Sequence, residues 1–271
     1  MASTTTAPLL LALHRGEPQL MFGIRTSRST DAVRIAASTG HHCVMIDLEH
    51  SAMPVDTAVT LAATAGDLGL TSLVRVPERE YGMIGRLLDG GADGIIAPRV
   101  ETADEARTLV EACRFPPRGH RSAVAQLPQR GMAPTAAAEL NPAIDRTTIV
   151  KVLIESPRGV ANVAEIAAVP GVDIVGIGAN DLSAELGIPG DYDDPRIAAA
   201  VDALVAAVRS QGTLGMIGGV PPGPAMRRFL DAGLSPLVLT GTDSGFLFSG
   251  ASARAAEWLA AIPATPARAA E

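Results

Sequence analysis

The sequence is poor in cysteine and in lysine. Its two cysteines, Cys43 and Cys113, are too few for a disulfide framework and their spacing fits no thiolate metal site, so we expect both to be small buried hydrophobic side chains. Lys151 is the only lysine, and the other basic residues counted with it are all arginines. A mechanism that needs a Schiff-base lysine must therefore use this one residue.

Long apolar runs and an excess of positive charge are missing as well. No apolar run approaches the roughly 18 residues of a membrane span, and the stretch 8–13 has neither the basic flank nor the cleavage signal of a secretory leader, so we expect a cytoplasmic protein with no membrane partner. The 29 acidic and 22 basic side chains give a net charge of −7, which argues against a nucleic-acid partner. Hydrophobic residues nevertheless make up 47 % of the chain, a core-forming composition.

Short apolar runs of β-type residues alternate with amphipathic, alanine-rich stretches from about residue 20 onward. The runs predict eight strands, at 21–24, 43–47, 72–76, 94–97, 149–154, 173–176, 214–217 and 236–239. Helices are predicted between them, for example at 31–38, 55–68, 81–89, 103–113, 159–168 and 195–210. Eight such units in one chain predict an α/β fold, a single-domain (β/α)8 TIM barrel.

The predicted barrel spans 20–262, with an N-terminal extension at 1–19 and a flexible tail at 263–271. A doubly wound sheet is the rival arrangement, but no glycine-rich dinucleotide fingerprint follows the first strand. The longest insert, 115–142, follows the fourth strand, is rich in proline, arginine and glutamine, and is predicted to be irregular. On a barrel it would lie over the active-site face, as a lid or as an oligomer contact.

Two acidic residues stand at the ends of neighbouring strands, where the catalytic groups of a barrel lie. Glu155 follows the fifth predicted strand and Asp181 the sixth, so their carboxylates can converge on one point. Close carboxylates repel each other unless a proton or a cation intervenes, and oxygen ligands without cysteine favour Mg²⁺ or Mn²⁺. Taken singly, Glu155 fits a helix N-terminal acid and Asp181 an N-cap. Taken together, they predict a metal site.

A histidine and an arginine at two other strand ends are the candidates for acid–base and charge-stabilising roles. His50 lies close in sequence to Asp47 and Glu49, which suits a general base that works near neutral pH, although it could be a polar loop residue. Arg75 ends the third strand, where a guanidinium would clamp a carboxylate or stabilise an enolate oxygen. A structural salt bridge to Asp47 or Glu49 is the competing role for Arg75.

Lys151 lies four residues before Glu155 on the same strand, which at about 3.3 Å per residue places it roughly 13 Å below that carboxylate. We therefore expect Lys151 at the end of the barrel opposite the active site, where it could not form an imine with a substrate. A lysine-dependent aldolase is disfavoured for that reason. Glycines after the last two strands, at 218–219 and 241–245, are typical of phosphate-binding turns but also of turns without a ligand, so no phosphate site is expected.

Six motifs resemble those of the metal-dependent class II pyruvate aldolases of the HpcH/HpaI type, in the same order and spacing over about residues 20–260. They are Met45-Ile-Asp-Leu-Glu-His50, Leu73-Val-Arg-Val-Pro77, Leu87-Leu-Asp-Gly-Gly-Ala92, Phe115-Pro-Pro-Arg-Gly-His-Arg121, Ile154-Glu155 and Gly178-Ala-Asn-Asp-Leu-Ser183. The resemblance implies reversible aldol cleavage of a 4-hydroxy-2-oxo acid. Pyruvate, or a close 2-oxo acid, and an aldehyde would be the small-molecule partners.

The resemblance also implies a role for each matching residue. Glu155 and Asp181 would hold a divalent cation, Mg²⁺, Mn²⁺ or Co²⁺, as the cofactor. Arg75 would stabilise the enolate, and His50 would act as the base with the aid of Asp47.

Two further implications concern the surroundings of these groups. Backbone amides near Asn180 and Asp181 would receive the substrate carboxylate. Asp89 would reach the catalytic histidine of a neighbouring subunit, so the protein would be a homo-oligomer, a trimer or a hexamer. The apolar stretch 246–249 suits a buried contact in such an assembly.

The sequence departs from the family's pattern near the substrate. Leu153 stands where many members carry glutamine, Arg25 where several carry tryptophan, and Asn180 lies in an Ala-Asn pair that replaces a common Pro-Ala. These changes leave the aldehyde acceptor open, and Arg25 indicates an anionic one.

Two other functions remain as alternatives. A citramalyl- or malyl-CoA-type lyase would need a basic groove for CoA, to which Arg227 and Arg228 could contribute. The other alternative is a non-catalytic barrel that binds a small acid.

Overall fold

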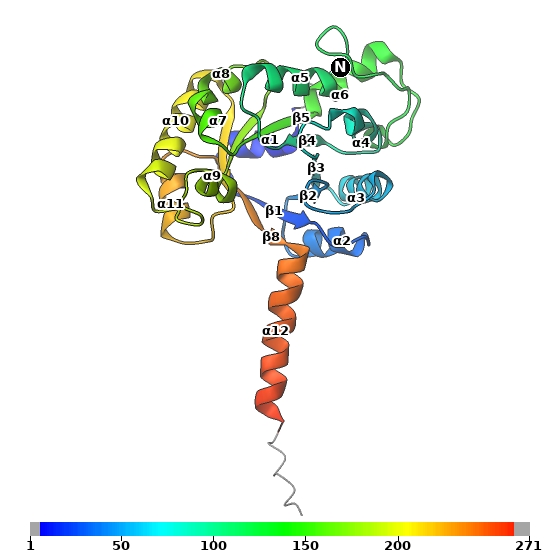
Figure 1. Cartoon of the computed structure of the whole chain (residues 1–271). Helices are drawn as coiled ribbons and strands as arrows, with labels where there is room; N and C mark the ends of the chain where they lie inside the picture. The colour runs from blue at the N-terminus through cyan, green and yellow to red at the C-terminus, as the bar shows by residue number, and fades with distance from the viewer. Residues whose placement is uncertain (1–5, 263–271) are drawn as a thin grey trace, which may run out of the picture.

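The structure, a computed structural model, describes residues 6–262 and contains eight parallel strands in a nearly closed barrel (Figure 1). The hydrogen-bonded order is β7-β6-β5-β4-β3-β2-β1-β8, so the last strand pairs with the first. The strands are β1 Gln19–Ile24, β2 Cys43–Asp47, β3 Thr71–Arg75, β4 Gly94–Ala97, β5 Ile149–Ile154, β6 Ile174–Gly178, β7 Leu214–Gly218 and β8 Leu237–Thr242. The predicted single-domain (β/α)8 TIM barrel is confirmed.

Helices between the strands cover the outside of the barrel (Figure 1). They are α2 Asp31–Ser38, α3 Val55–Asp67, α4 Ile84–Asp89, α5 Ala103–Cys113, α7 Pro157–Ala161, α8 Val163–Ala167, α9 Ala179–Glu185, α10 Pro195–Gln211 and α11 Pro224–Asp231. Their apolar faces and the outward side chains of the strands form the main core. Parallel strands covered on both sides read as continuous apolar runs, and β2 and β5 are accordingly buried at every position.

Two predicted helices are divided in the structure. The segment predicted at 81–89 begins as a 3-10 turn, η1 Tyr81–Met83, and only α4 is α-helical. The segment predicted at 159–168 forms α7 and α8, which meet at Asn162. Helix α7 also begins earlier than predicted, because the Ser156 hydroxyl accepts a hydrogen bond from the Gly159 N–H and caps it.

The insert predicted as irregular at 115–142 contains the start of a helix, α6 Ala137–Thr147, so this part of the prediction is wrong. Pro142 lies inside α6, and a proline in a helix interior argues against a helix when only the sequence is considered. The insert also holds the 3-10 turn η2 Pro128–Arg130 and has a small core of its own, made of Phe115, Leu127, Leu140 and Ile144. Its Gln129 amide donates to the carbonyls of Leu88 and Ala92, at 2.8 and 3.1 Å, which ties the insert to the end of α4.

The N-terminal segment contributes a helix, α1 Pro8–His14, that closes one end of the barrel. Three of its leucines, Leu9, Leu10 and Leu13, join a second core inside the ring of strands. This core includes the first residues of β5, β6, β7 and β8, namely Ile149, Ile174, Leu214 and Leu237. Helix α1 therefore plugs the end at which the strands start. The opposite end, where the strands finish, is left for the site.

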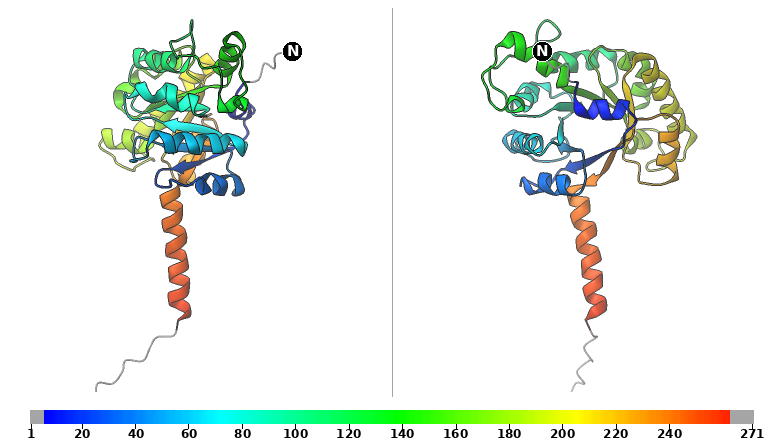
Figure 2. Two further views of the ribbon diagram at one scale, coloured as in Figure 1. Left: turned by 90° about the vertical axis from the view of Figure 1, so that its right-hand side faces the viewer. Right: turned by 180° about the vertical axis from the view of Figure 1, so that it is seen from behind.

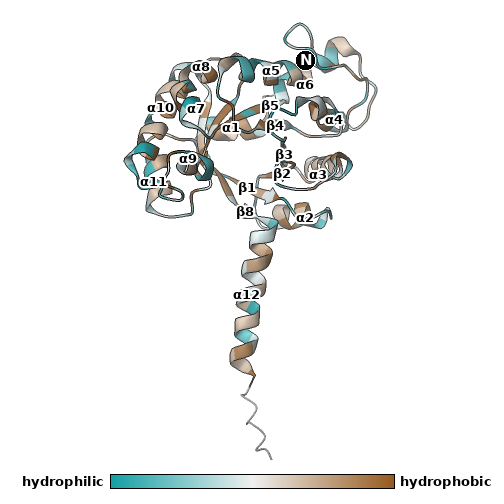
Figure 3. Ribbon diagram, viewed as in Figure 1, coloured by the Kyte–Doolittle hydropathy of each residue, from teal (hydrophilic) through white to brown (hydrophobic). Residues whose placement is uncertain are grey.

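The last helix, α12 Asp243–Ala261, projects away from the barrel (Figures 1 and 2). None of its described residues is buried, and Phe248, Trp258 and Leu259 are among its exposed apolar side chains. Hydrophobic residues occur along the length of this helix (Figure 3). At its base, the Phe246 ring packs against Phe22 with the ring centroids 4.9 Å apart. Across the described residues, no helix has the length and apolar character needed to span a membrane. The predicted tail, 263–271, lies outside the described residues.

Candidate active site

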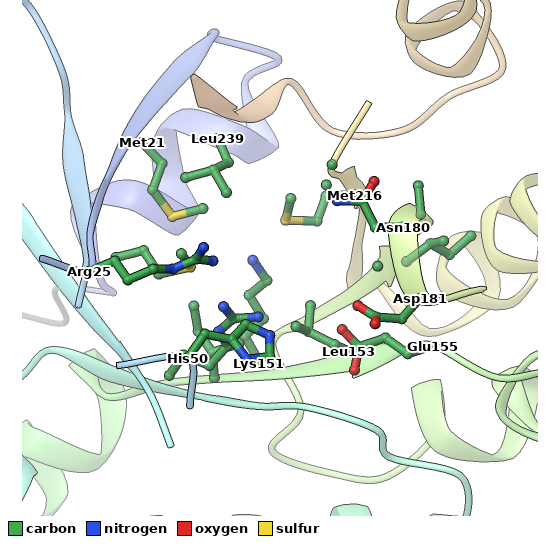
Figure 4. A pocket seen from close by; sticks show the side chains of 18 residues that line it. Met21, Arg25, His50, Lys151, Leu153, Glu155, Asn180, Asp181, Met216 and Leu239 are labelled. Atoms are coloured by element: carbon green, nitrogen blue, oxygen red, sulfur yellow. The ribbon is translucent and has the colours of Figure 1, made fainter. Parts of the chain in front are cut away.

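A cavity of about 150 Å³ lies inside the ring, where the strands end (Figure 4). It is small beside the roughly 300–1,000 Å³ of sites for drug-sized ligands, which suits a small acid. Among the side chains that line it are seven of the residues predicted from the sequence, namely Arg25, His50, Arg75, Leu153, Glu155, Asn180 and Asp181. The structure therefore brings side chains from different strand ends together around one cavity.

Asp47 is fully buried behind the cavity wall and joins two arginines. Arg75 donates from Nε to Asp47 Oδ1 at 3.0 Å and from Nη2 to Oδ2 at 2.7 Å, and Arg25 Nε donates to Oδ2 at 3.1 Å. Burial alone would raise the pKa of Asp47, but the hydrogen bonds and charge of Arg75 lower it below its ordinary value, with help from the His50 N–H and Arg25. The salt bridge considered for Arg75 is present, and it fixes the guanidinium along the cavity wall.

Glu49 and His50 extend this network from the end of β2. Arg75 Nη1 lies 3.1 Å from Glu49 Oε2, and His50 Nε2 lies 3.7 Å from the same oxygen. The His50 side chain is 49 % exposed, so it is accessible to a ligand in the cavity. Burial raises the pKa of Glu49 above its ordinary value, although Arg75 acts against this shift. From the sequence, Glu49 is expected only as a neighbour of His50 and as a competing partner of Arg75. Its place between Asp47 and His50 is the signal that points to the site.

Glu155 is only 4 % exposed and is positioned by two backbone features that the sequence analysis missed. The Arg99 N–H donates to Glu155 Oε2 at 2.8 Å. Arg99 reaches it from a left-handed conformation, φ 49°, which is uncommon for a residue other than glycine and costs free energy. A Cβ on Gly178 would lie 2.5 Å from Glu155 Oε1, so the carboxylate occupies the space that this glycine leaves open. In the sequence, the glycine at the end of β6 was the only sign of the space that Glu155 occupies.

Glu155 and Asp181 lie side by side in the cavity wall (Figure 4). Burial raises the pKa of Glu155, and the charges of Asp181 and Glu49 act in the same direction, so that the pKa is about 7. The Arg99 N–H acts against this shift. Within the described part of the chain, the negative charge of this pair of carboxylates is not balanced by an adjacent positive charge. Two carboxylates with room for water and substrate oxygens form a donor set that suits Mg²⁺ or Mn²⁺. Among residues 6–262, no group of three or more His, Cys, Asp or Glu side chains is arranged to hold a metal ion. Other oxygens would therefore complete the coordination shell.

Asn180 faces Arg25 across the cavity (Figure 4). The Tyr192 hydroxyl donates to Asn180 Oδ1, which orients the amide. A Cβ on Gly219 would lie 3.0 Å from Asn180 Nδ2, and Gly219 has a φ of 86°, so a glycine is required beside this amide.

Asp89 lies outside the cavity lining, at the end of α4. Its Oδ1 accepts a hydrogen bond at 2.7 Å from Nη2 of Arg121, a residue of the insert. The role expected for Asp89 in a neighbouring subunit stays a prediction.

Lys151 lines the cavity, so its predicted position at the opposite end of the barrel is wrong. The sequence estimate counted residues along β5 alone and ignored both the length of the lysine side chain and the tilt of barrel strands. The strand ladder pairs Lys151 with Ile96 and Ile96 with Arg75. Lys151 is therefore two strand spacings, about 10 Å, from Arg75 along the ladder.

Comparisons with known proteins agree with this geometry. Residues 21–226 match the profile of the HpcH/HpaI aldolase/citrate lyase family. The chain is 38 % identical over 199 residues to a 4-hydroxy-4-methyl-2-oxoglutarate aldolase of Chaetomium globosum, covering 72 % of this chain and 74 % of that one. It is 34 % identical over 258 residues to a 4-hydroxy-2-oxo-heptane-1,7-dioate aldolase of Salmonella arizonae, covering 91 % and 92 %.

A solved structure supports the same assignment. The HpcH/HpaI aldolase from Desulfitobacterium hafniense matches with a TM-score of 0.85 at 26 % identity, over 96 % of this chain and 98 % of that one. The chain therefore belongs to the HpcH/HpaI aldolase/citrate lyase family.

Proposed function

We propose that the protein cleaves a 4-hydroxy-2-oxo acid into pyruvate, or a close 2-oxo acid, and an aldehyde. The observation that carries this proposal is the presence of Glu155, Asp181 and Arg75 around one small cavity at the strand ends. Two carboxylates that need a cation, beside a fixed guanidinium, form a site suited to an enolate. The names of the two relatives, both aldolases of 4-hydroxy-2-oxo acids, support the same reaction.

Glu155 and Asp181 would hold the divalent cation, Mg²⁺, Mn²⁺ or Co²⁺. When bound, such a cation would draw electron density from the 2-oxo group and stabilise the negative charge that develops there. The raised pKa of Glu155, about 7, supports this assignment because it indicates a carboxylate without enough compensating positive charge.

His50 and Arg75 would carry out the proton transfer and the charge stabilisation. His50 would take the proton from the C4 hydroxyl as the C3–C4 bond breaks, so that C4 leaves as the aldehyde carbonyl and the bonding electron pair forms the enolate. Arg75, held by Asp47, would stabilise that enolate. A proton delivered to C3 then completes the 2-oxo acid.

Three further residues of the cavity would contact the substrate. Asn180 presents its amide, Leu153 presents an apolar surface, and Arg25 adds a positive charge that favours an anionic acceptor. The CoA-lyase alternative gains no support from Arg227 and Arg228, whose guanidinium groups pair with surface carboxylates on or near α11.

A homo-oligomer, a trimer or a hexamer by family resemblance, is part of the proposal. Helix α12 exposes Leu247, Phe248 and Trp258, with exposed fractions of 73, 76 and 63 %. Such side chains on a helix with no buried residue among those described are typical of a subunit contact. Asp89 would complete the site of a neighbouring subunit.

The test is an aldol cleavage assay with 4-hydroxy-2-oxo acids, followed by chelation with EDTA and return of Mg²⁺, Mn²⁺ or Co²⁺. We expect chelation to abolish turnover and the cation to restore it in the unchanged protein but not in Glu155→Ala or Asp181→Ala. Circular dichroism would verify that both variants are folded. Full activity in excess EDTA would refute the cation-dependent mechanism, and the absence of cleavage with any cation would refute the proposed reaction.

A further inference from the structure

Lys151 is a buried lysine in the wall of the active-site cavity. The residue is 2 % exposed and lines the same cavity as Arg75 and Glu155 (Figure 4). Within residues 6–262, its ammonium group makes no side-chain hydrogen bond and no ion pair. An unpaired buried charge costs free energy unless something satisfies it.

The fold aims this side chain at the cavity. Side chains two and four residues apart on a strand share a face, so Lys151 points to the same side of β5 as Leu153 and Glu155. Space for its stem comes from Gly176 on the adjacent strand, where a Cβ would lie 3.4 Å from Lys151 Cε. The cavity wall around it is largely apolar, with Met21, Met45, Ile96, Leu153, Met216 and Leu239.

The nearby carboxylates do not neutralise this ammonium group directly. Asp47 is held by Arg25 and Arg75, and Glu49 lies against Arg75. Burial first, and the charge of Arg75 in addition, lower the pKa of Lys151 to about 8, while Cys43 and Glu155 act against this shift. A cation bound at Glu155 and Asp181 would remove part of the negative charge that favours the ammonium form. The ammonium form of Lys151 would then be favoured when an anionic group of a ligand lies beside it.

We propose that Lys151 binds a second carboxylate of the substrate and so makes the protein selective for dicarboxylic 2-oxo acids. This inference rests on the proposed function, in which the 2-oxo acid end lies at Glu155 and Asp181. The ammonium group then donates a charge-assisted hydrogen bond to the distant carboxylate inside an apolar wall. Arg25, the other cation considered for this role, already donates to Asp47.

The experiment compares two acids of equal chain length, 2-oxoglutarate and 2-oxopentanoate, which differ only in a terminal carboxylate or methyl group. Binding to the Mg²⁺-loaded full chain is measured by calorimetry. We expect the unchanged protein to bind 2-oxoglutarate at least about tenfold more tightly, the size of effect typical of a hydrogen bond to a charged group. Lys151→Met, of similar length but without the charge, should lose this preference.

Two control variants distinguish a ligand contact from a structural role. Ile96→Met, beside Lys151 in the ladder, changes the apolar wall and should keep the preference, and Leu239→Met, at another apolar residue of the wall, should keep it as well. If Lys151→Met fails to fold by circular dichroism, Lys151→Gln takes its place. Because neither acid has a 4-hydroxyl group to cleave, the measurement reports the Lys151 contact separately from the aldolase activity tested above.

Several results would overturn the inference. One is a preference that persists in the Lys151 variant or disappears in either control variant. Another is an equal loss of affinity for both acids in the Lys151 variant, which would mean that the ammonium group only balances the charge of Glu155. Equal or undetectable binding of the two acids by the unchanged protein would count against it as well. So would a borohydride-trapped adduct of either acid on Lys151, because the side chain would then form a covalent bond.

Discussion

At the scale of single residues, the role that we propose for Glu155 combines two requirements that oppose each other. Its carboxylate must be ionised to bind a cation, yet burial and the neighbouring acids favour the protonated form and raise its pKa to about 7. Cation binding must therefore displace a proton whenever the pH is below that value.

We predict that the affinity for Mn²⁺ rises with pH through about 7, by up to about tenfold per unit below the pKa of Glu155, and levels off above it. Calorimetry in buffers with different heats of ionisation would measure both the affinity and the protons released. The release should fall from nearly one proton at low pH to nearly none at high pH. An affinity that is flat between pH 6 and 8 would contradict the assignment of Glu155.

Lys151 shows at the same scale what a sequence estimate misses. Counting residues along β5 gave a distance between backbone positions, whereas the side chain closes much of that distance and the ladder places Lys151 level with Arg75. The positions of Glu155 and Asp181 needed no such detail, because both follow apolar strands and the ends of barrel strands meet at one face. Glu49 was underestimated since its contact with Arg75 depends on a side-chain conformation that no sequence pattern reveals.

At the scale of elements, the end of β6 controls the space available to the carboxylates. Gly178 has a φ of −86°, which any residue can adopt, so the requirement for glycine here is steric rather than conformational. An added methyl group would lie 2.5 Å from Glu155 Oε1 and 2.6 Å from its Cγ. The side chain of Glu155 would have to move.

Gly178→Ala should therefore weaken Mn²⁺ binding by about tenfold or more while the protein stays folded, since a displaced ligand loses its contact with the cation. The matched control is Gly218→Ala at the end of β7, where the new Cβ would meet only Met216 Cε, at 3.9 Å. Calorimetry and thermal unfolding would measure affinity and stability separately. Equal affinities for the two variants would refute this role of Gly178.

The elements themselves were largely predictable, for reasons visible in their composition. β2, β4 and β5 agree with the prediction at both ends, because each is a short buried apolar run with clear boundaries. The helix α6 was missed because Pro142 lies in its interior and its surroundings are polar. The cap at Ser156 was missed because a serine before a proline is also typical of a turn.

At the scale of the whole molecule, α12 is an exposed apolar arm attached to a well-packed barrel. A monomer with this structure would leave the side chains of Phe248, Trp258 and Leu259 exposed to water. Large exposed apolar patches of this kind mark association surfaces in soluble proteins. The fold is predictable from one chain, whereas the partner that we propose for α12, a second subunit, is not, because it would lie in another molecule.

We predict that the protein sediments as an oligomer and that Phe248→Glu with Trp258→Glu reduces its mass to that of one chain, 27.8 kDa. Leu68→Glu, a change at an exposed leucine elsewhere on the surface, is the matched control and should leave the mass unchanged. Mixing inactive Asp89→Asn and His50→Ala chains under subunit exchange should restore some activity. A fully active monomer would contradict the shared site.

The single lysine, Lys151, can serve as a spectroscopic probe of the cavity. Because the chain contains one lysine, protein labelled with nitrogen-15 at the lysine side chain carries exclusively one labelled amino group, and it lies in the active-site wall. Its resonance would report the charge and surroundings of the cavity without overlap from the surface. Titrations of pH, cation and acid could thus be followed at one atom of the intact protein, with no introduced tag.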